Sequence, residues 1–166
     1  ANRVVTITSL QDSGGTANGG QDTANLSIAS TVTVSAVNSA PVVTTTAGAT
    51  AFVEGNNVAS VPVIIDAGFT VTDADNTTLA SATVSITTGF ATAKDVLAFS
   101  NDGATMGNIA ASYDAGTGVL TLTSSGATAT LAEWQTALAA VTYTNSSDAP
   151  STATRTISFV VNDGTD

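Results

Sequence analysis

Short runs in which apolar and polar residues alternate recur along the whole chain, and Gly, Asn and Asp separate them. Successive side chains of a β-strand point to opposite faces of its sheet, so this alternation is the pattern of strands with one buried face. Many short strands at such spacing predict an all-β fold, a Greek-key β-sandwich. Representative runs are Val5/Ile7, Val32/Val34, Val61/Val63/Ile65, Val84/Ile86, Leu120/Leu122 and Ile157/Phe159/Val161.

One stretch departs from the β pattern and predicts a helix. Thr130 and Glu133 have the spacing of a capping box, in which each side chain satisfies a backbone N–H at the start of a helix. Trp134 and Leu138 then share one helical face. We expect a single short helix over about residues 130–140 that plugs an end or edge of the sandwich, with Trp134 as a core residue rather than a ligand platform.

The composition limits the partners of the protein. With 43% hydrophobic residues, the 166-residue chain has ample material for a core. Three basic and thirteen acidic residues give a net charge of −10, which repels nucleic acid and anionic lipid and favours cations. Cysteine is absent, which argues against a disulfide-stapled animal domain and favours a bacterial extracellular protein stabilised by metal. No apolar run approaches the length of a membrane span, so we expect no membrane insertion.

Two copies of one segment lie near the two ends of the sequence. Arg3 and Arg155 each begin an alternating apolar run followed by an Asp-containing turn, and a one-residue gap aligns Asp12 with Asp163. Repetition at a fixed period is typical of tandem arrays, which supply length, spacing and adhesion. The sequence therefore favours a structural or binding role.

The repetition also predicts the domain organisation. Residues 3–37 look like two strands joined by a long turn-forming loop, and Pro41, which interrupts strand pairing, follows soon after. We expect residues 1–38 to be the last two strands of a preceding repeat. Residues 39–166 would form one sandwich repeat that lacks its final strand.

The residue types present argue against catalysis on chemical grounds. Without His or Cys, the usual nucleophile–base pairs and imidazole or thiolate metal sites cannot form. Glu54 and Glu133 are the only Glu residues, and nothing marks a glycosidase pair of carboxylates. Lys94 has the chemistry for an isopeptide bond, but its neighbours favour an exposed loop end. We expect no enzymatic activity.

The loop at residues 72–76 carries several oxygen donors. Asp73, Asp75 and Asn76 follow an apolar strand, and such a group suits a hard cation that takes six to eight oxygen ligands. The same pattern also forms Asx-turns at strand ends without any metal. The residues alone leave both interpretations open.

The order of these motifs resembles the cadherin-type repeat. The resemblance rests on the linker Asn38–Pro41, on Phe-x-Glu-x-Asn at 52–56 and on Thr-Asp-Ala-Asp-Asn at 72–76. The later part of the chain is similar to the long cadherin-like modules, related to proteoglycan-type repeats, of giant bacterial RTX-type adhesins. That similarity is carried by Asp95–Phe99, Trp134–Leu138, Val141–Tyr143 and Val161–Gly164.

The resemblance implies an Ig/cadherin-like fold and Ca²⁺ at the junctions between repeats. By analogy with that family, Asn38, Asp73 and Asp75 would bind calcium at the junction before the repeat. Glu54, with Asp163 as a weaker candidate, would serve the junction at the far end.

Two departures from the family pattern imply fewer or weaker calcium ions. Ser39 occupies a linker position that is usually acidic or amide, and the Asp-Arg-Glu motif is absent. The resulting expectation is an extracellular, calcium-stiffened spacer in a large bacterial adhesin, surface layer or filament. Its partners would be neighbouring copies of the repeat, in a covalent array or a filament, with any cell-surface or matrix ligand elsewhere in the full protein.

Two alternatives remain at this point. The chain could be a self-assembling filament subunit that exchanges strands between copies. It could also bind carbohydrate or ice through its Thr-rich faces, although one Trp and two Tyr offer few rings for sugar stacking.

Overall fold

The computed structural model describes residues 2–165, and Ala1 and Asp166 lie outside this range. The chain divides into two compact units, with the boundary between Val37 and Asn38. This is one residue before the boundary that the sequence suggests. The two units are described separately.

Unit 1 is a β-hairpin with a long connection. Its strands are antiparallel, with Arg3 opposite Val32 and Ile7 opposite Ile28, and the register shifts between Ile7 and Ser9. Every residue of the first strand is exposed, because unit 1 has no second layer to cover it. The elements are β1 (Asn2–Gln11), the 3₁₀ turn η1 (Ala17–Gly19) and β2 (Thr23–Thr33).

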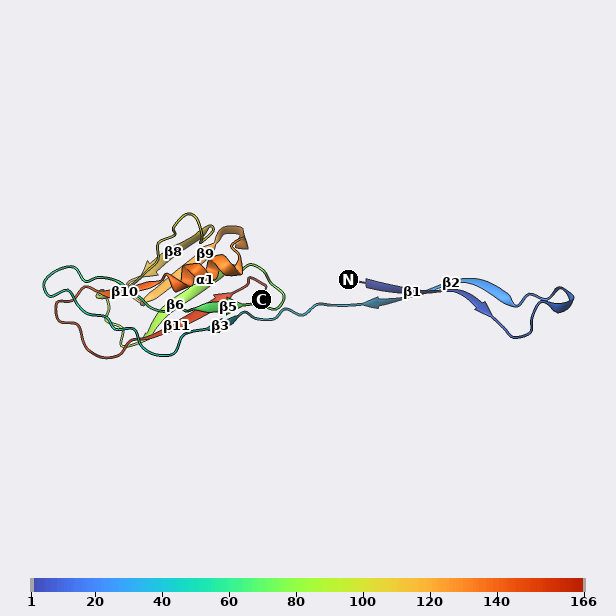
Figure 1. The fold of residues 1–166 in the computed structure, drawn as a ribbon, viewed down its shortest axis with the longest axis horizontal. Helices are drawn as coiled ribbons and strands as arrows, with labels where there is room; N and C mark the ends of the chain where they lie inside the picture. The colour runs from blue at the N-terminus through green and yellow to red at the C-terminus, as the bar shows by residue number, and fades with distance from the viewer. Residues whose placement is uncertain (1, 166) are drawn as a thin grey trace. The chain divides into compact units, whose positions relative to one another are not determined.

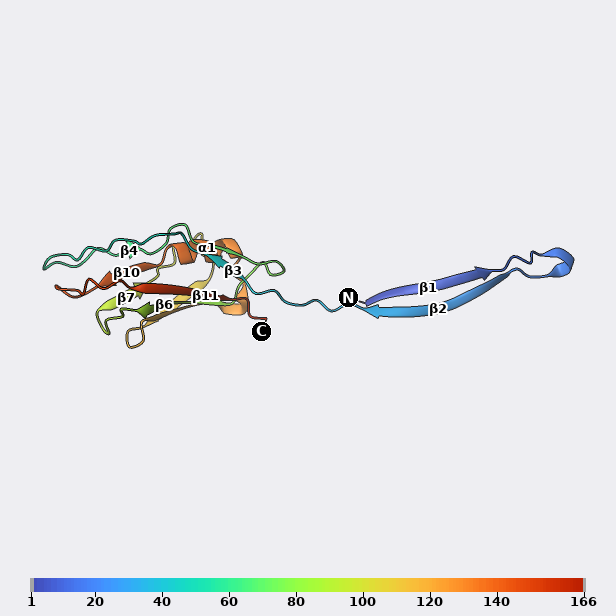
Figure 2. The same cartoon turned by 90° about the horizontal axis from the view of Figure 1, so that it is seen from below.

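Unit 2 is an antiparallel β-sandwich with one α-helix, which confirms the predicted all-β fold class. Figure 2 shows β4, β10 and α1 over one side of the layer that contains β6 and β11, and Figure 1 gives the view at right angles to it. One sheet has the order β11 (Thr156–Asn162), β6 (Ser81–Thr88), β9 (Val119–Ser124), β8 (Ile109–Asp114). The others are β4 (Val63–Ile64), β10 (Thr142–Asn145), β7 (Asp95–Ala98), and the pair β3 (Val42–Thr44) and β5 (Thr70–Thr72); a 3₁₀ turn, η2 (Ser125–Ala127), follows β9.

The core follows the alternation of the sequence. Ala82, Val84 and Ile86 of β6 are buried, as are Leu120 and Leu122 of β9, while the residues between them are more exposed. Burial of alternate residues is what a two-layer sandwich demands, since only the inner face of each sheet leaves water.

The predicted helix is confirmed as α1 (Leu131–Ala139), and its capping box is present. The backbone N–H of Thr130 donates to Glu133 Oε2 at 2.7 Å, and the backbone N–H of Glu133 donates to Thr130 Oγ1 at 3.3 Å. Trp134 is fully buried, and its Nε1 donates to the carbonyl of Leu79 at 3.0 Å. Trp134 is therefore the core residue that its spacing indicates.

One predicted strand is much shorter than its pattern. Alternation over residues 61–65 predicts a full strand, but only Val63 and Ile64 pair with β10, and Val61 is 76% exposed. Pro62 explains the difference, because proline has no N–H to donate to a ladder and confines strands to short or edge positions.

A buried carboxylate connects the two layers of unit 2. Asp95, at the start of β7, is fully buried and accepts hydrogen bonds from Tyr143 Oη at 2.6 Å, from the backbone N–H of Ala91 at 2.8 Å and from Asn145 Nδ2. Arg155 Nε lies 3.3 Å from Asp95 Oδ2 in an ion pair. Since Arg155 immediately precedes β11, the pair links β7 and β10 in one layer to β11 in the other.

The surroundings of Asp95 favour its charged form. Burial by itself raises the pKa of Asp95, but the hydrogen bonds from Tyr143, Ala91, Asn145 and Arg155 outweigh it and hold the pKa below the ordinary value of 3.8. Burial and the neighbouring carboxylate raise the pKa of Tyr143 to about 12, so its hydroxyl remains a donor.

We expect Asp95→Asn to destabilise unit 2 strongly. The substitution leaves the Arg155 guanidinium, whose side chain is 10% exposed, without its counter-ion. Breaking a buried pair in this way costs about 3–5 kcal/mol. Urea denaturation at neutral pH measures the loss, with the exposed Asp148→Asn as the control of equal charge change.

The pH dependence gives a second readout of the same pair. Because the folded-state pKa of Asp95 is depressed, its contribution is present above the unfolded pKa and is lost as pH falls through the folded pKa. The wild-type protein should lose stability below about pH 4, and Asp95→Asn should show a shallower acid loss than Asp148→Asn. Equal acid slopes in the two variants would contradict this role of Asp95.

Candidate metal centre

The predicted acidic loop lies where three parts of unit 2 converge. Val42, the first residue of β3, pairs with Thr72, the last residue of β5, so the linker before β3 meets the Asp73–Asn76 loop after β5. The end of β11 also reaches this place, because Asp163 is hydrogen bonded to Asn38. The strand ends thus gather side chains that are up to 125 residues apart in sequence.

The loop after β5 is an Asx-turn. Asp73 Oδ1 accepts the backbone N–H groups of Asp75 at 3.0 Å and Asn76 at 2.9 Å. Asp75 Oδ2 accepts the backbone N–H of Ser39 at 3.0 Å. The metal-free interpretation of this motif is therefore correct for Asp73 Oδ1, and Asp75 orients the linker.

Asp163 is held by two asparagine amides. Asn38 Nδ2 donates to Asp163 Oδ2 at 2.7 Å, and Asn76 Nδ2 donates to the same oxygen at 3.1 Å and to Asn38 Oδ1 at 2.9 Å. The backbone N–H of Thr165 donates to Asp163 Oδ1 at 2.8 Å. These contacts place the Asp163 carboxylate against the linker and the Asp73 loop.

Both carboxylates are held in the ionised form. Backbone hydrogen bonds from Asn76 and Asp75 lower the pKa of Asp73, against the opposing effect of the nearby Asp163 charge. The side-chain hydrogen bond from Asn38 and the backbone N–H of Thr165 lower the pKa of Asp163. Two negative charges are thus placed close together.

Asp73 Oδ2 is the unusual atom of the cluster. Among the described residues, it is a buried side-chain oxygen without a hydrogen-bond partner. A buried carboxylate oxygen without a partner is costly unless a proton donor or a cation satisfies it. The orphaned oxygen fits a hard cation, which would also offset the repulsion between Asp73 and Asp163.

The cluster alone does not make a complete metal site. Within residues 2–165, no group of three or more His, Cys, Asp or Glu side chains is arranged to hold a metal ion. Asp73 and Asp163 supply two carboxylates, and Asn38 and Asn76 can add amide oxygens. Calcium takes six to eight oxygens, so further ligands would have to come from solvent or from a neighbouring repeat.

The structure separates the predicted ligands into two groups and corrects one placement. Asn38, Asp73 and Asp75 come together as expected, but Asp163 joins them instead of lying at the far end, because β11 runs toward the Asn38 end of the unit. Glu54 is not part of this cluster; its Oε2 accepts the backbone N–H of Asn56 at 2.7 Å. Figure 1 shows the β3–β4 connection turning at the opposite end of unit 2.

Two interactions of the cluster and its surroundings were not predicted from the sequence. The Asn76 amide bridges Asn38 and Asp163, and only its position after the Asp-x-Asp motif signals such a role. The sequence did not predict the Asp95–Arg155 pair, although Arg155 begins the duplicated segment and Asp95 begins the Asp95–Phe99 motif.

Comparison with known proteins gives one relative at the sequence level. The chain is 43% identical over 91 residues to Halomucin from Haloquadratum walsbyi (strain DSM 16790 / HBSQ001); the match covers 54% of this chain and 1% of that protein. This similarity is consistent with a repeat of a surface protein. No family model matches the chain, and no solved structure matches it. In the described part of the chain, no helix has the length and apolar character of a membrane span.

We expect Asn76→Asp to destabilise the metal-free protein. The change removes an amide donor from Asp163 and Asn38 and adds another negative charge to a cluster that already holds Asp73, Asp75 and Asp163. Loss of the two hydrogen bonds should cost about 1–2 kcal/mol in urea denaturation with EDTA, and added salt should reduce the part due to repulsion. Asn57→Asp adds the same charge in an exposed loop and is the matched control. Equal effects of the two substitutions would show that Asn76 has no special role.

Proposed function

We propose that this chain is an extracellular spacer repeat of a large surface protein and that Ca²⁺ stiffens its junctions. The observation that carries the proposal is the orphaned Asp73 Oδ2 beside Asp163, at the point where the linker enters unit 2. The duplicated Arg3 and Arg155 segments support a tandem array. The small share of Halomucin that the chain covers agrees with one repeat among many.

The position of the cluster explains how a cation would affect rigidity. Asp73 and Asp163 are fixed to the body of unit 2, and Asp75 and Asn38 hold the linker next to them. Bound calcium would supply a positive charge that oxygens from two successive repeats share. Linker residues that are held from both sides lose rotational freedom, which turns a flexible connection into a stiff one.

In this proposal the junction would be cadherin-like, with a reduced ligand set. Glu54 belongs to the β3–β4 connection, which turns at the other end of unit 2 (Figure 1), and there it would contribute to the next junction. The hydrogen bond with Asn38 puts Asp163 at the near junction and not at the far one. Each repeat would then contribute the ligands Asp73, Asp163 and Asn38 to its junction with the repeat before it. An adhesin or surface layer would use such a rod to hold a binding domain away from the cell.

Calcium should stabilise the protein in the range of weak extracellular sites. A dissociation constant of about 0.1–1 mM implies that about 10 mM calcium adds 1.4–2.7 kcal/mol of stability. The melting temperature should then rise by roughly 3–10 °C. Differential scanning calorimetry of three tandem copies with calcium and with EDTA measures the shift.

Matched variants locate the site in the same assay. Asp73→Asn and Asp163→Asn should each abolish most of the calcium-dependent shift, whereas the exposed Asp148→Asn should leave it unchanged. Magnesium at the same concentration controls for general screening of the −10 charge. A shift that survives both site substitutions would place calcium elsewhere.

The junction model also makes a prediction about shape. In three tandem copies, calcium should increase the maximum dimension measured by small-angle X-ray scattering, because the junctions no longer bend. Substituting Asp73 and Asp163 by Asn in the middle copy alone should restore bending only at the junction that precedes this copy. Equal loosening of both junctions would show that the assigned polarity is wrong.

A further inference from the structure

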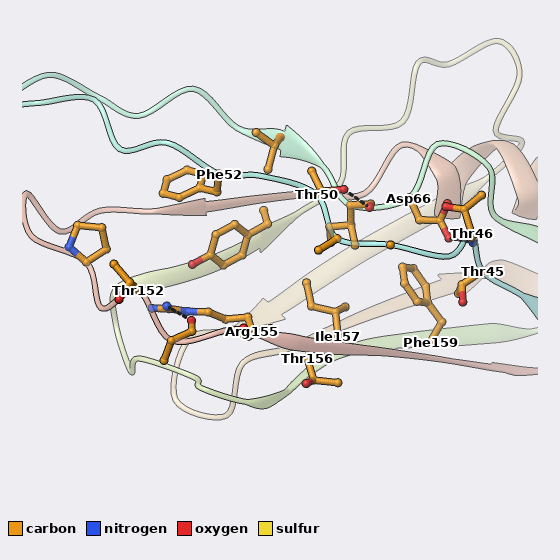
Figure 3. A pocket seen from close by; sticks show the side chains of 18 of the residues that line it. Thr45, Thr46, Thr50, Phe52, Asp66, Thr152, Arg155, Thr156, Ile157 and Phe159 are labelled. Atoms are coloured by element: carbon orange, nitrogen blue, oxygen red, sulfur yellow. Dashed lines mark hydrogen bonds between the residues drawn. The ribbon is translucent and has the colours of Figure 1, made fainter.

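An open groove runs beside β11 in unit 2. In the described residues, β11 ends its sheet, with β6 on one side and no strand in the sheet order on the other. The groove has a volume of about 680 Å³ and lies between β11 and the segment at residues 45–54. Figure 3 shows Ile157 and Phe159 projecting from β11 toward this segment, while Thr156 points the other way. The groove therefore exposes the inner face of β11.

The hydrophobic core is incomplete along this groove. The inward-facing residues of β6, from Ala82 to Ile86, are buried, whereas Ile157 and Phe159 of the neighbouring β11 are only partly buried. Phe52 and Ile65 on the opposite wall are also only partly buried. Apolar side chains that line an unfilled groove next to a strand edge are what an added β-strand covers.

Unit 1 supplies a template for the missing neighbour. Arg3 in β1 corresponds to Arg155 just before β11, and the apolar residues that follow each Arg alternate in the same phase. β1 pairs with β2, so the β1–β2 register shows how a β2 strand fits the pattern of β11. Ile7 and Phe159 are equivalent in this alignment, which places Ile28 opposite Phe159.

The apolar face of β2 matches the groove. Leu26, Ile28 and Val32 alternate on one face, and Ile28 and Val32 are 57% and 53% exposed in the hairpin. An isolated two-stranded hairpin is marginally stable, because nothing covers its apolar face. Moving β2 from β1 to β11 exchanges one antiparallel ladder for another and buries Ile28 and Val32 against the core.

We infer that the groove beside β11 binds the β2 strand of a second copy of this chain. In the register of the hairpin, Ile28 lies opposite Phe159, Ser30 opposite Ile157 and Ala29 opposite Ser158. The inference adds a contact between copies to the proposed spacer function, and it rests on no calcium ligand.

The linker disfavours insertion of β2 into the groove of its own chain. In this register Val32 lies beside Arg155, and the strand from Arg155 to Asp163 extends for about 26 Å. Asn38 is hydrogen bonded to Asp163, and the six residues from Val32 to Asn38 span at most about 22 Å. No length remains for the reversal of direction. A second copy has no such restriction.

Donation by one copy and acceptance by the next produces a head-to-tail chain. Each molecule has one β2 and one groove, and these are different surfaces, so the contact is heterologous. Heterologous contacts that do not close into a ring extend into filaments.

Disulfide trapping tests the register directly, since the protein has no cysteine of its own. An equimolar mixture of the Ser158→Cys and Ala29→Cys proteins, full length and in EDTA, should form a mixed disulfide under mild oxidation. Replacing Ala29→Cys by Ser30→Cys moves the thiol to the opposite face of β2, and the yield should fall roughly tenfold. Mass spectrometry separates the mixed product from homodimers.

Sedimentation provides the second measurement. The wild-type chain should associate in EDTA in a concentration-dependent manner, Ile28→Asp should abolish the association, and Thr31→Asp on the outer face should leave it intact. A wild-type monomer at every concentration, or mixed disulfide at the level of the Ser30→Cys control, overturns the inference. So does an intramolecular disulfide in the Ser158→Cys/Ala29→Cys double variant at high dilution. Because all arms contain EDTA, these outcomes are separate from failure of the calcium proposal.

Discussion

The ion pair between Asp95 and Arg155 is the constraint on which the rest of unit 2 depends. The chain is poor in charged residues, yet it places a carboxylate fully inside and surrounds it with donors from β10, the turn before β7 and the start of β11. Arg155 also donates to the carbonyls of Ser151 and Ala153, which shapes the segment leading into β11. A buried pair of this kind fixes strand position, because any displacement leaves a charge unpaired.

The position of β11 in turn determines both surfaces to which a function is assigned. Asp163 follows the C-terminal end of β11, where it lies next to Asn38 of the linker and the Asp73 loop. Along its length, β11 exposes Ile157 and Phe159 to the groove. One strand therefore serves the proposed calcium junction and the proposed strand-acceptor site, and both are contacts between successive copies.

The two contacts rely on different physical interactions. A cation at Asp73 and Asp163 would limit bending where one repeat follows another, through charge that salt screens only partly in a half-buried cluster. A strand in the groove would join copies through backbone hydrogen bonds and apolar burial, which salt does not weaken. The strongly acidic composition, with a net charge of −10, suits a chain that works among abundant cations.

The sequence by itself determined the local structure of this protein. The alternating pattern determined the strands of the sandwich, and Thr130 and Glu133 determined the start of α1. Pro62 limited the length of β4. These features depend on neighbouring residues, so periodicity and capping reveal them. Only the tertiary structure decided that Asp163 lies beside Asn38 and that Asp95 meets Arg155, because strand order and direction bring together residues far apart in the chain. The same long-range arrangement left the groove beside β11 open, which no local pattern encodes.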